Sequence, residues 1–392
     1  MKDSSLQPLI YLDFAAATPL APEVEEAMRP YFREHFANPR ALHRDGRANN
    51  TVVENARRDI ARSIHASADE LYFTSGGTDA NTRAFLGVVN ALQDSGRTLS
   101  DMHIIVSMLE HPSVRACAEM LARRGVSVSY APVTDKGVVD ADALIALIKE
   151  NTVLVSLMFV NNELGTVQPV LEVAKAIRAK REASREKITP LLHTDATQAP
   201  CTIALDVRAL GVDLMTLDAY KMYGPAGVGA LYVRGGVPYA GLSGTLYKKD
   251  SDQGGTPNVA GIVGFAKAFV LADERREDDT KMLEDLRQYM ESRIEERFPD
   301  VRINGRRGVR TGGIVNITVP NIEGEFLVAG LSERGIAASA KSACLSGGGE
   351  GSYVIASFDP EHANNTVRFS FGRTTTRDDI DVAISVLSEL IP

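Results

Sequence analysis

A regular alternation of apolar runs and helical patterns, beginning near residue 100, is the feature that most constrains the fold. The apolar runs are HIIVS, SVSYAPV, TVLVSLMFV and PLLHTDA, and between them lie the helical patterns VRACAEMLARRG, ADALIALIKE and VLEVAKAIRAKR. Strands that alternate with helices form mostly parallel sheets with helices on both faces. We therefore predict an α/β fold with a mostly parallel sheet in its large domain.

Polar residues follow several of these predicted strands. His111, Asn162, Asp195 and Lys221 all come at or just after the end of an apolar run. In open α/β sheets the ligand binds outside the carboxyl ends of the strands, so we expect these side chains to meet at one site. Each residue taken alone is also explained as a helix cap or an ordinary loop residue.

Asp195 and Lys221 form the most informative pair of this set. HTDA ends one apolar run, and VDLMTLDAYK carries a second run into a Gly-Pro turn. A lysine together with an aspartate that faces a pyridinium nitrogen is the protein signature of pyridoxal phosphate chemistry. The pair alone leaves a second interpretation open, namely a capping aspartate and a solvated turn lysine.

The segment ELYFTSGGTDANTRAFLGVVNAL predicts a strand, a tight turn and a helix. The backbone N–H groups of Gly77 and Thr78 would then lie at a helix N-terminus, which favours an anion such as phosphate. The alternative is a plain capped helix.

After residue 257 the patterns change to those of a smaller α+β unit, with a long charged helix from Asn258 to about Phe298. We predict two domains: residues 21–257 form the large α/β domain, and residues 1–20 with 258–392 form the small one. The small unit contains KSACLSGGGEGSYV, where Cys344 lies among glycines. Glycine-rich chain is commonly mobile, which suits a reactive cysteine better than a packing one.

Composition narrows the possible partners. The chain has 392 residues, of which 44% are hydrophobic and 24% charged, as in a folded globular protein. Its net charge of -8 argues against nucleic acid or an anionic membrane as the main partner. Three scattered cysteines form neither a disulfide framework nor a metal site, and we find no signal peptide or spanning helix. We expect a cytoplasmic protein without a metal.

The ordered motifs resemble the fold-type I, class V aminotransferase family, and within it the cysteine desulfurases of the NifS/IscS type. The resemblance runs nearly end to end and is carried by YLDFAAATP, FANP, FTSGGTDAN, EHPSV, VNNELGTVQP, HTDATQ, YKMYGPAGVGALYV, GGTPN, SACLSGGGEGSYV and VRFSFGR. It implies a seven-stranded sheet, pyridoxal 5'-phosphate as cofactor, L-cysteine as substrate and a homodimer. Because the chain ends soon after its last predicted helix, we expect any C-terminal docking extension to be short or absent.

The resemblance also assigns the cofactor site. Lys221 would bind pyridoxal phosphate covalently, and Asp195 would keep its ring nitrogen protonated. Asn162 and Gln198 would reach the ring hydroxyl, and His111 would stack on the ring and transfer protons. The phosphate would be bound by Gly77 and Thr78, by Asp218 and Tyr220 in the same cup, and by Thr256 from a second subunit.

The remaining roles concern the substrate. Arg368 would bind the substrate carboxylate, a task for which its planar fork is suited, with Asn38 and Asn162 nearby. Arg368 could instead serve only as a salt bridge at the edge of a sheet. Cys344 would attack the substrate sulfur and carry it as a persulfide to an acceptor, such as an iron-sulfur scaffold or a carrier for tRNA thiolation.

Three positions depart from the family pattern. Asp218 stands where serine is usual, Tyr220 where histidine is usual, and Gln253 where arginine is common. An ionised carboxylate about 4 Å from a phosphate would cost on the order of 4 kcal/mol per unit charge at an effective dielectric of about 20. We therefore expect Asp218 to be protonated, to turn toward a cation, or to weaken cofactor binding. Lys341, where glycine is usual, could favour the thiolate of Cys344.

Other functions stay open on the sequence alone. A different pyridoxal phosphate lyase or aminotransferase, acting on selenocysteine or cysteine sulfinate, would not need Cys344. A weakly active scaffold paralogue is suggested only by the altered phosphate cup. The joint presence of Lys221, Asp195, His111, Cys344 and Arg368 favours an active desulfurase.

Overall fold

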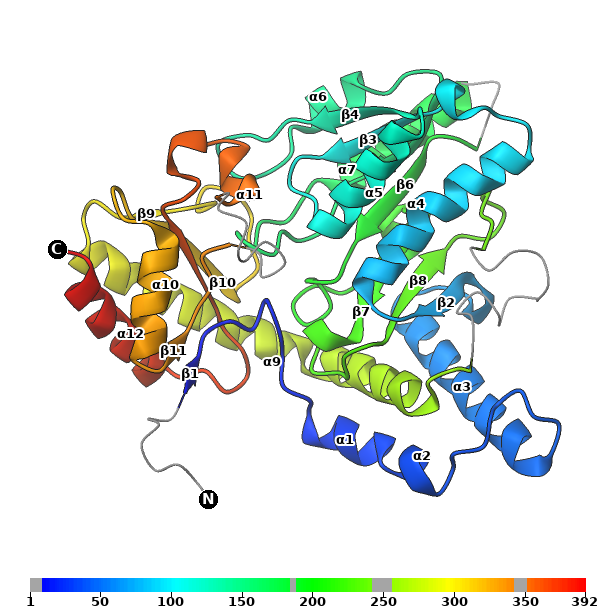
Figure 1. Ribbon diagram of the computed structural model, residues 1–392, viewed down its shortest axis with the longest axis horizontal. Helices are drawn as coiled ribbons and strands as arrows, with labels where there is room; N and C mark the ends of the chain where they lie inside the picture. The colour runs from blue at the N-terminus through cyan, green and yellow to red at the C-terminus, as the bar shows by residue number, and fades with distance from the viewer. Residues whose placement is uncertain (1–8, 184–187, 242–255, 342–350) are drawn as a thin grey trace.

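The computed structural model describes residues 9–183, 188–241, 256–341 and 351–392 (Figure 1). Its centre is a seven-stranded sheet with the order β2-β8-β7-β6-β5-β3-β4, in which β8 alone runs antiparallel to its neighbours. The strands are β2 (Leu71–Thr74), β3 (His103–Ser107), β4 (Ser127–Ala131), β5 (Thr152–Ser156), β6 (Leu191–Asp195), β7 (Leu214–Asp218) and β8 (Gly229–Val233). The predicted α/β fold with a mostly parallel sheet is confirmed.

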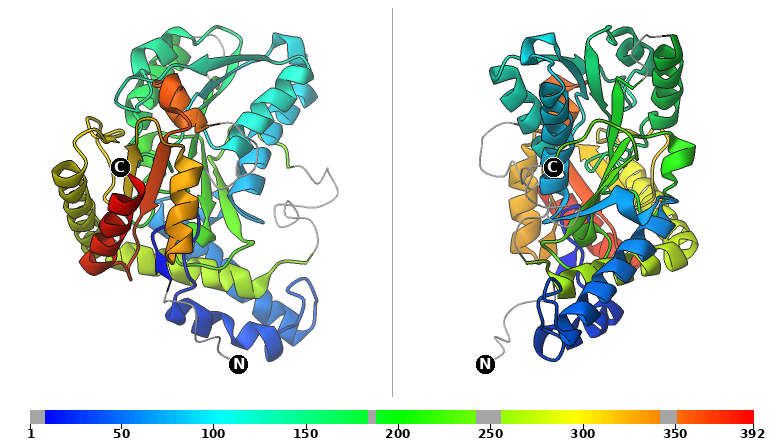
Figure 2. Two further views of the ribbon diagram at one scale, coloured as in Figure 1. Left: turned by 60° about the vertical axis from the view of Figure 1, so that its left-hand side comes forward. Right: turned by 90° about the vertical axis from the view of Figure 1, so that its right-hand side faces the viewer.

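Helices cover both faces of this sheet, as the two views in Figure 2 show. One face packs against α4 (Gly77–Asp94) and α5 (Pro112–Arg123). The other packs against α1 (Pro22–Met28), α3 (Arg44–Ser63), α6 (Ala141–Ala146) and α7 (Val170–Ala183). The inner strands β3, β5 and β6 are buried along their whole length, because both of their faces are covered.

A second core lies around a three-stranded sheet of the order β12-β10-β9. Its strands are β9 (Arg302–Ile303), β10 (Ile314–Thr318) and β12 (Thr366–Ser370), and its helices are α10 (Gly324–Glu333) and α12 (Arg377–Leu390). The N-terminal strand β1 (Ile10–Tyr11) pairs in parallel with β11 (Ile336–Ala337) and brings Leu12 into this core. Short helices complete the described chain: α2 (Pro30–Arg33), α8 (Val207–Leu210) and α11 (Tyr353–Ala356).

The helix α9 (Val259–Arg297) connects the two cores and runs from below the large sheet to the small core in Figure 1. Its first half, including Phe265 and Phe269, packs in the core of the large sheet, and its second half, including Leu286 and Met290, packs in the small core. The helix begins and ends close to the predicted bounds. Because α9 contributes to both cores, the predicted domain boundary at residue 258 stays a prediction.

No helix in the described part of the chain is long and apolar enough to cross a membrane. The same residues contain no cluster of three or more His, Cys, Asp or Glu side chains that could bind a metal ion.

Candidate active site

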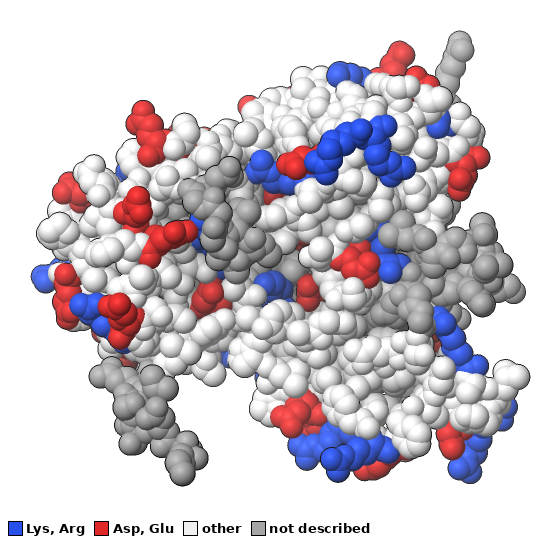
Figure 3. Space-filling model, in the orientation of Figure 1, with Lys and Arg blue, Asp and Glu red and all other residues white. Residues whose placement is uncertain are grey.

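A cavity of about 250 Å³ lies where β6 and β7 end at the carboxyl edge of the large sheet. Ten of the predicted residues line it: Gly77, Thr78, His111, Asn162, Asp195, Gln198, Asp218, Tyr220, Lys221 and Arg368. Figure 3 shows basic side chains with acidic ones on either side in the hollow near the centre of the drawn face. A larger hollow of about 530 Å³ beside α7 and α8 contains none of the predicted residues.

Three predicted residues are not among those that line the cavity. Asn38 is exposed, and its side chain accepts the backbone N–H of Arg40 at 2.9 Å within its own loop. Thr256 is exposed just before α9. Cys344 lies outside the described residues. The roles of all three stay predictions, including the expected contact of Thr256 with a second subunit.

A chain of polar side chains connects Asp195 to His111. Asp195 Oδ2 accepts from Asn81 Nδ2 at 2.8 Å, and the same amide nitrogen donates to Ser113 Oγ at 3.0 Å. Ser113 Oγ lies 2.8 Å from Nδ1 of His111. The backbone N–H of Thr197 donates to the other carboxylate oxygen of Asp195 at 3.0 Å. These bonds fix the carboxylate and the imidazole relative to each other.

The sequence interpretation missed Asn81 and Ser113. The available signal was their position: each lies in the first turns of a helix, α4 or α5, that follows a strand of the sheet. Helices in such folds begin at the edge where the preceding strands end, so polar residues there face the ligand site.

The sequence interpretation also missed Glu110, the residue before His111. Its side chain is fully buried, and Oε1 accepts the backbone N–H of Met158 at 2.6 Å, while Oε2 has no hydrogen-bond partner within residues 9–183, 188–241, 256–341 and 351–392. Burial, reinforced by the negative charge of Asp195, raises the pKa of Glu110 to about 8. Glu110 is therefore mainly protonated at neutral pH and adds little negative charge behind His111.

Lys221 ends a short 3₁₀ turn (Ala219–Lys221) directly after β7. Its Nζ donates to the backbone carbonyl of Ala15 at 3.1 Å and also to that of Ala16. Gln198 Nε2 donates to the same Ala15 carbonyl at 2.9 Å. The N-terminal segment that contains Ala15 and Ala16, called the N-terminal arm below, thus contacts the lysine and the glutamine directly.

Arg368 projects from β12 with its side chain 1% exposed. Its Nη2 lies 2.6 Å from Asp13 Oδ1, its Nη1 donates to the backbone carbonyl of Asn162 at 2.9 Å, and its Nε has no hydrogen-bond partner in the described part of the chain. Both open alternatives are therefore compatible with the geometry: Arg368 forms a buried ion pair, and it also lines the cavity with one donor unused.

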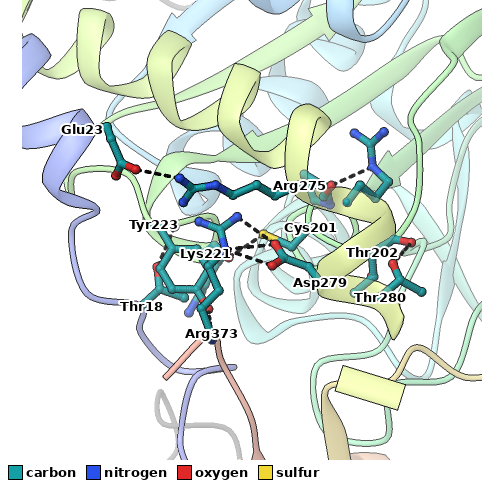
Figure 4. A network of polar contacts seen from close by, with 12 residues as sticks. Thr18, Glu23, Cys201, Thr202, Lys221, Tyr223, Arg275, Asp279, Thr280 and Arg373 are labelled. Atoms are coloured by element: carbon teal, nitrogen blue, oxygen red, sulfur yellow. Dashed lines mark hydrogen bonds and ion pairs between the residues drawn. The ribbon is translucent and has the colours of Figure 1, made fainter. Parts of the chain in front are cut away.

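A clasp of three residues holds the backbone just after Lys221. Tyr223 has a positive φ of 62°, a conformation rarely adopted by a bulky side chain. Its hydroxyl accepts the backbone N–H of Arg373 at 2.8 Å, and the Arg373 guanidinium lies 4.1 Å from the centre of its ring. Arg373 in turn pairs with Asp279 of α9 at 2.8 Å (Figure 4). Tyr223, Arg373 and Asp279 are called the clasp below.

The two cysteines in the described chain are poor nucleophiles. Cys117 packs on the inner side of α5, and Cys201 lies next to the clasp, as Figure 4 shows. Burial raises the pKa of the Cys201 thiol to about 12, and burial also raises the pKa of Cys117. Both thiols stay protonated at neutral pH, and Cys117 is a packing residue of the core between the sheet and α5.

Asp218 faces backbone N–H groups and forms no ion pair within the described chain. Its Oδ2 accepts the N–H of Gly77 at 2.8 Å, and its Oδ1 accepts the N–H of Tyr220 at 2.8 Å. The expected turn toward a cation is therefore not observed. Lys341 also has a partner, since its Nζ lies 2.7 Å from Glu325 Oε1.

The cavity fits pyridoxal phosphate at the ring end. Asp195, which is expected to face the ring nitrogen, lines it at the end of β6, and Lys221 lines it just after the neighbouring strand β7. Asn81 Oδ1 and Asn162 Oδ1 are buried and have no hydrogen-bond partner among the described residues, so a bound ligand can supply the missing donor. At the phosphate end, Asp218 accepts one of the N–H groups that the anion would use.

Comparisons with known proteins agree with this geometry. The family model of class-V aminotransferases matches residues 10–382. The cysteine desulfurase IscS of Dictyoglomus turgidum is 38% identical over 97% of this chain and 94% of its own length. The protein of the same name from Methanosarcina thermophila is 36% identical over 97% of this chain and 92% of its own length.

Solved structures show the same architecture. A NifS-like protein superposes with a TM-score of 0.87 at 30% identity, over 97% of this chain and 99% of the other. The structure of SspA in complex with cysteine superposes with a TM-score of 0.78 at 28% identity, over 92% of this chain and 98% of the other.

Proposed function

The chain belongs to the class V aminotransferase family of pyridoxal phosphate enzymes, and we propose that it is a cysteine desulfurase that converts L-cysteine to L-alanine and delivers the sulfur to an acceptor. Relatives at 38% and 36% identity over nearly the whole chain are named cysteine desulfurases. The observation that carries the proposal is that Lys221, Asp195, His111 and Arg368 line one cavity.

Some residues of the cavity bind or orient the cofactor, and others bind the substrate. Bound pyridoxal phosphate withdraws electrons from the substrate α-carbon when its ring nitrogen is protonated, and Asp195 maintains that proton. Asn81 holds the carboxylate of Asp195 in place through a 2.8 Å hydrogen bond. Arg368 binds the substrate carboxylate and uses the Nε donor that is unpaired in the described chain.

Proton transfer belongs to Lys221 and His111. Lys221 Nζ takes the α-proton, because it enters the cavity from the end of β7 beside Asp195. His111 is held by Ser113 at the start of α5 and can pass a proton across the same cavity. Because the buried Glu110 is mainly protonated, it adds little negative charge beside this pair.

Sulfur transfer requires a thiolate, which we assign to Cys344. Its sulfur forms a bond to the substrate sulfur while the carbon–sulfur bond breaks, and the electron pair of that bond stays on the substrate carbon. Protonation of this carbon gives alanine, and the enzyme keeps a persulfide. The high pKa values of Cys117 and Cys201 support this assignment, since neither thiol supplies a thiolate at neutral pH.

The test compares Cys344→Ala with Cys117→Ala and Cys201→Ala in the purified protein loaded with pyridoxal phosphate. We expect Cys344→Ala to bind L-cysteine but to form no alanine and no protein persulfide, whereas the other two variants keep their activity. Alanine is measured by amino-acid analysis and persulfide by mass spectrometry. A folded Cys344→Ala variant with full alanine production would exclude the proposed sulfur transfer and favour a lyase that eliminates sulfur directly.

The proposal also includes a homodimer, a protein that accepts the sulfur and a cytoplasmic location. Exposed apolar side chains around α2, namely Phe32, Phe36 and Leu42, support a contact with a second copy of the chain. Light scattering of the purified protein checks the dimer. The acceptor is a thiol-bearing protein, such as an iron-sulfur scaffold or a carrier for tRNA thiolation, and a cytoplasmic location stays a prediction.

A further inference from the structure

A carboxylate occupies the start of helix α4 inside the cofactor cavity. Gly77 is the first residue of this 18-residue helix, and Gly76 before it has no side chain that could cap the helix. Asp218 supplies the cap from the end of β7, because its Oδ2 accepts the N–H of Gly77 at 2.8 Å. The positive end of the helix dipole stabilises a negative charge at this point.

A phosphate group would use the same N–H group. Helix N-termini bind phosphate through their first free backbone N–H groups. The space is narrow, since a Cβ atom placed on Gly77 would lie 3.2 Å from Asp218 Oδ2 and 3.4 Å from Thr197 Oγ1. The Thr197 hydroxyl is buried and has no hydrogen-bond partner among the described residues. Asp218 thus accepts the Gly77 N–H that a phosphate would use, while the nearby Thr197 hydroxyl is an unused donor.

The cavity offers little positive charge to balance two anions. Lys221 and Arg368 are the cationic side chains among the described residues that line it. Lys221 Nζ donates to carbonyls of the N-terminal arm, and Arg368 is paired with Asp13. A phosphate that entered while Asp218 kept its place would meet a like charge at contact distance.

We propose that Asp218 is an internal anion that occupies the phosphate-binding position at the N-terminus of α4. Pyridoxal phosphate then binds fully only after this carboxylate leaves the N–H of Gly77. Asp218 thereby sets how strongly the site prefers pyridoxal phosphate over unphosphorylated pyridoxal. Pyridoxal has no phosphate, so it reaches Asp195 and Lys221 while Asp218 stays bound to Gly77. This inference rests on pyridoxal phosphate being the cofactor of the proposed desulfurase.

The test titrates cofactor-free wild type, Asp218→Asn and Asp218→Ser with pyridoxal phosphate and with pyridoxal, followed by visible absorbance. We expect the Kd of pyridoxal phosphate to fall about tenfold or more in both variants, because the like charge is removed. The Kd of pyridoxal should change by less than about twofold, since Asp218 lies at the phosphate end and not at the ring end of the cavity.

Asp206→Asn is the matched control. Asp206 also accepts two backbone N–H groups, those of Arg208 and Ala209 at 2.9 Å each, but it lies outside the cavity. This variant should leave both Kd values unchanged. As a second measurement, inorganic phosphate should raise the melting temperature of cofactor-free Asp218→Asn more than that of the wild type, because this variant has no carboxylate at the N-terminus of α4 to compete with the anion.

Two results would overturn the proposal. Unchanged affinity for pyridoxal phosphate in folded Asp218 variants would show that the carboxylate leaves the N–H of Gly77 at no cost in the free energy of cofactor binding. Equal tightening for pyridoxal and pyridoxal phosphate would show that Asp218 acts on the ring or on the fold. A protein that gives the expected shifts but makes no alanine from L-cysteine would instead refute the desulfurase and leave this proposal standing.

Discussion

The clasp behind Lys221 allows a sharp prediction about stability. Asp279 and Arg373 are 9% and 16% exposed, and they form three hydrogen bonds of 2.8–3.2 Å between α9 and the segment that follows β12. Replacing Asp279 by alanine leaves the Arg373 guanidinium buried without its charge partner. Removing one member of a buried ion pair typically costs 3–5 kcal/mol, and because Arg373 keeps its contact with the Tyr223 ring, we expect about 3 kcal/mol.

A second, exposed ion pair between the same two segments provides a control for the effect of burial. Asp285 and Arg377 form a second Asp–Arg pair at 2.7 Å, also between α9 and the C-terminal part of the chain, but both side chains are 55% exposed. Water and salt screen such a pair, so Asp285→Ala should change stability far less than Asp279→Ala does. The two variants differ mainly in the burial of the pair that is broken.

The assay is urea unfolding of both variants and the wild type, followed by circular dichroism and by the visible band of the cofactor. Asp279→Ala should unfold at clearly lower urea, and its cofactor should dissociate earlier, because the clasp holds the turn that carries Lys221. If Asp279→Ala and Asp285→Ala unfolded at the same urea concentration, the argument from burial would be wrong.

Three further predictions follow from the site. Lys221→Ala should show no visible band of covalently bound pyridoxal phosphate, since Lys221 is the lysine that lines the cavity among the described residues; absorbance after reconstitution checks this. Relative to Glu110→Gln, the wild type should lose stability as pH rises from about 4.5 to about 8, because the unfolded chain ionises Glu110 while the folded protein holds its proton; the difference in slope between the two proteins, up to about 1.4 kcal/mol per pH unit, is read from melting curves across that range. Arg368→Lys should raise the KM for L-cysteine roughly tenfold or more, as steady-state kinetics would show, because lysine cannot replace the planar fork of donors.

The sequence was sufficient for the large sheet because its inner strands are buried on both faces. The run HIIVS matches β3 residue for residue, and the run PLLHTDA contains all of β6, since burial on both sides favours a largely apolar pattern along each strand. The same rule placed His111, Asn162, Asp195 and Lys221 at one edge, and all four line the cavity.

The pattern could not reveal contacts between residues that are far apart in the chain. Arg368 and Asp13 are 355 positions apart, and nothing in either segment indicates the other. Asn81 looks like an ordinary polar residue of a helix until the fold brings it to 2.8 Å from Asp195. For Asp218 the sequence raised a conflict of charge, but only the geometry shows which N–H groups its carboxylate accepts.

The cofactor site depends on both cores of the protein. Lys221 lies at the end of a strand of the large sheet, yet its amine contacts carbonyls of the N-terminal arm, and that arm is anchored in the small core through Leu12 and the pairing of β1 with β11. Tyr223 is held by Arg373, which follows the last strand of the small core, and α9 packs in both cores. We therefore expect a substitution that loosens the small core to act on the lysine without touching the cavity, and by linkage we expect cofactor binding to stabilise the contacts between the two cores.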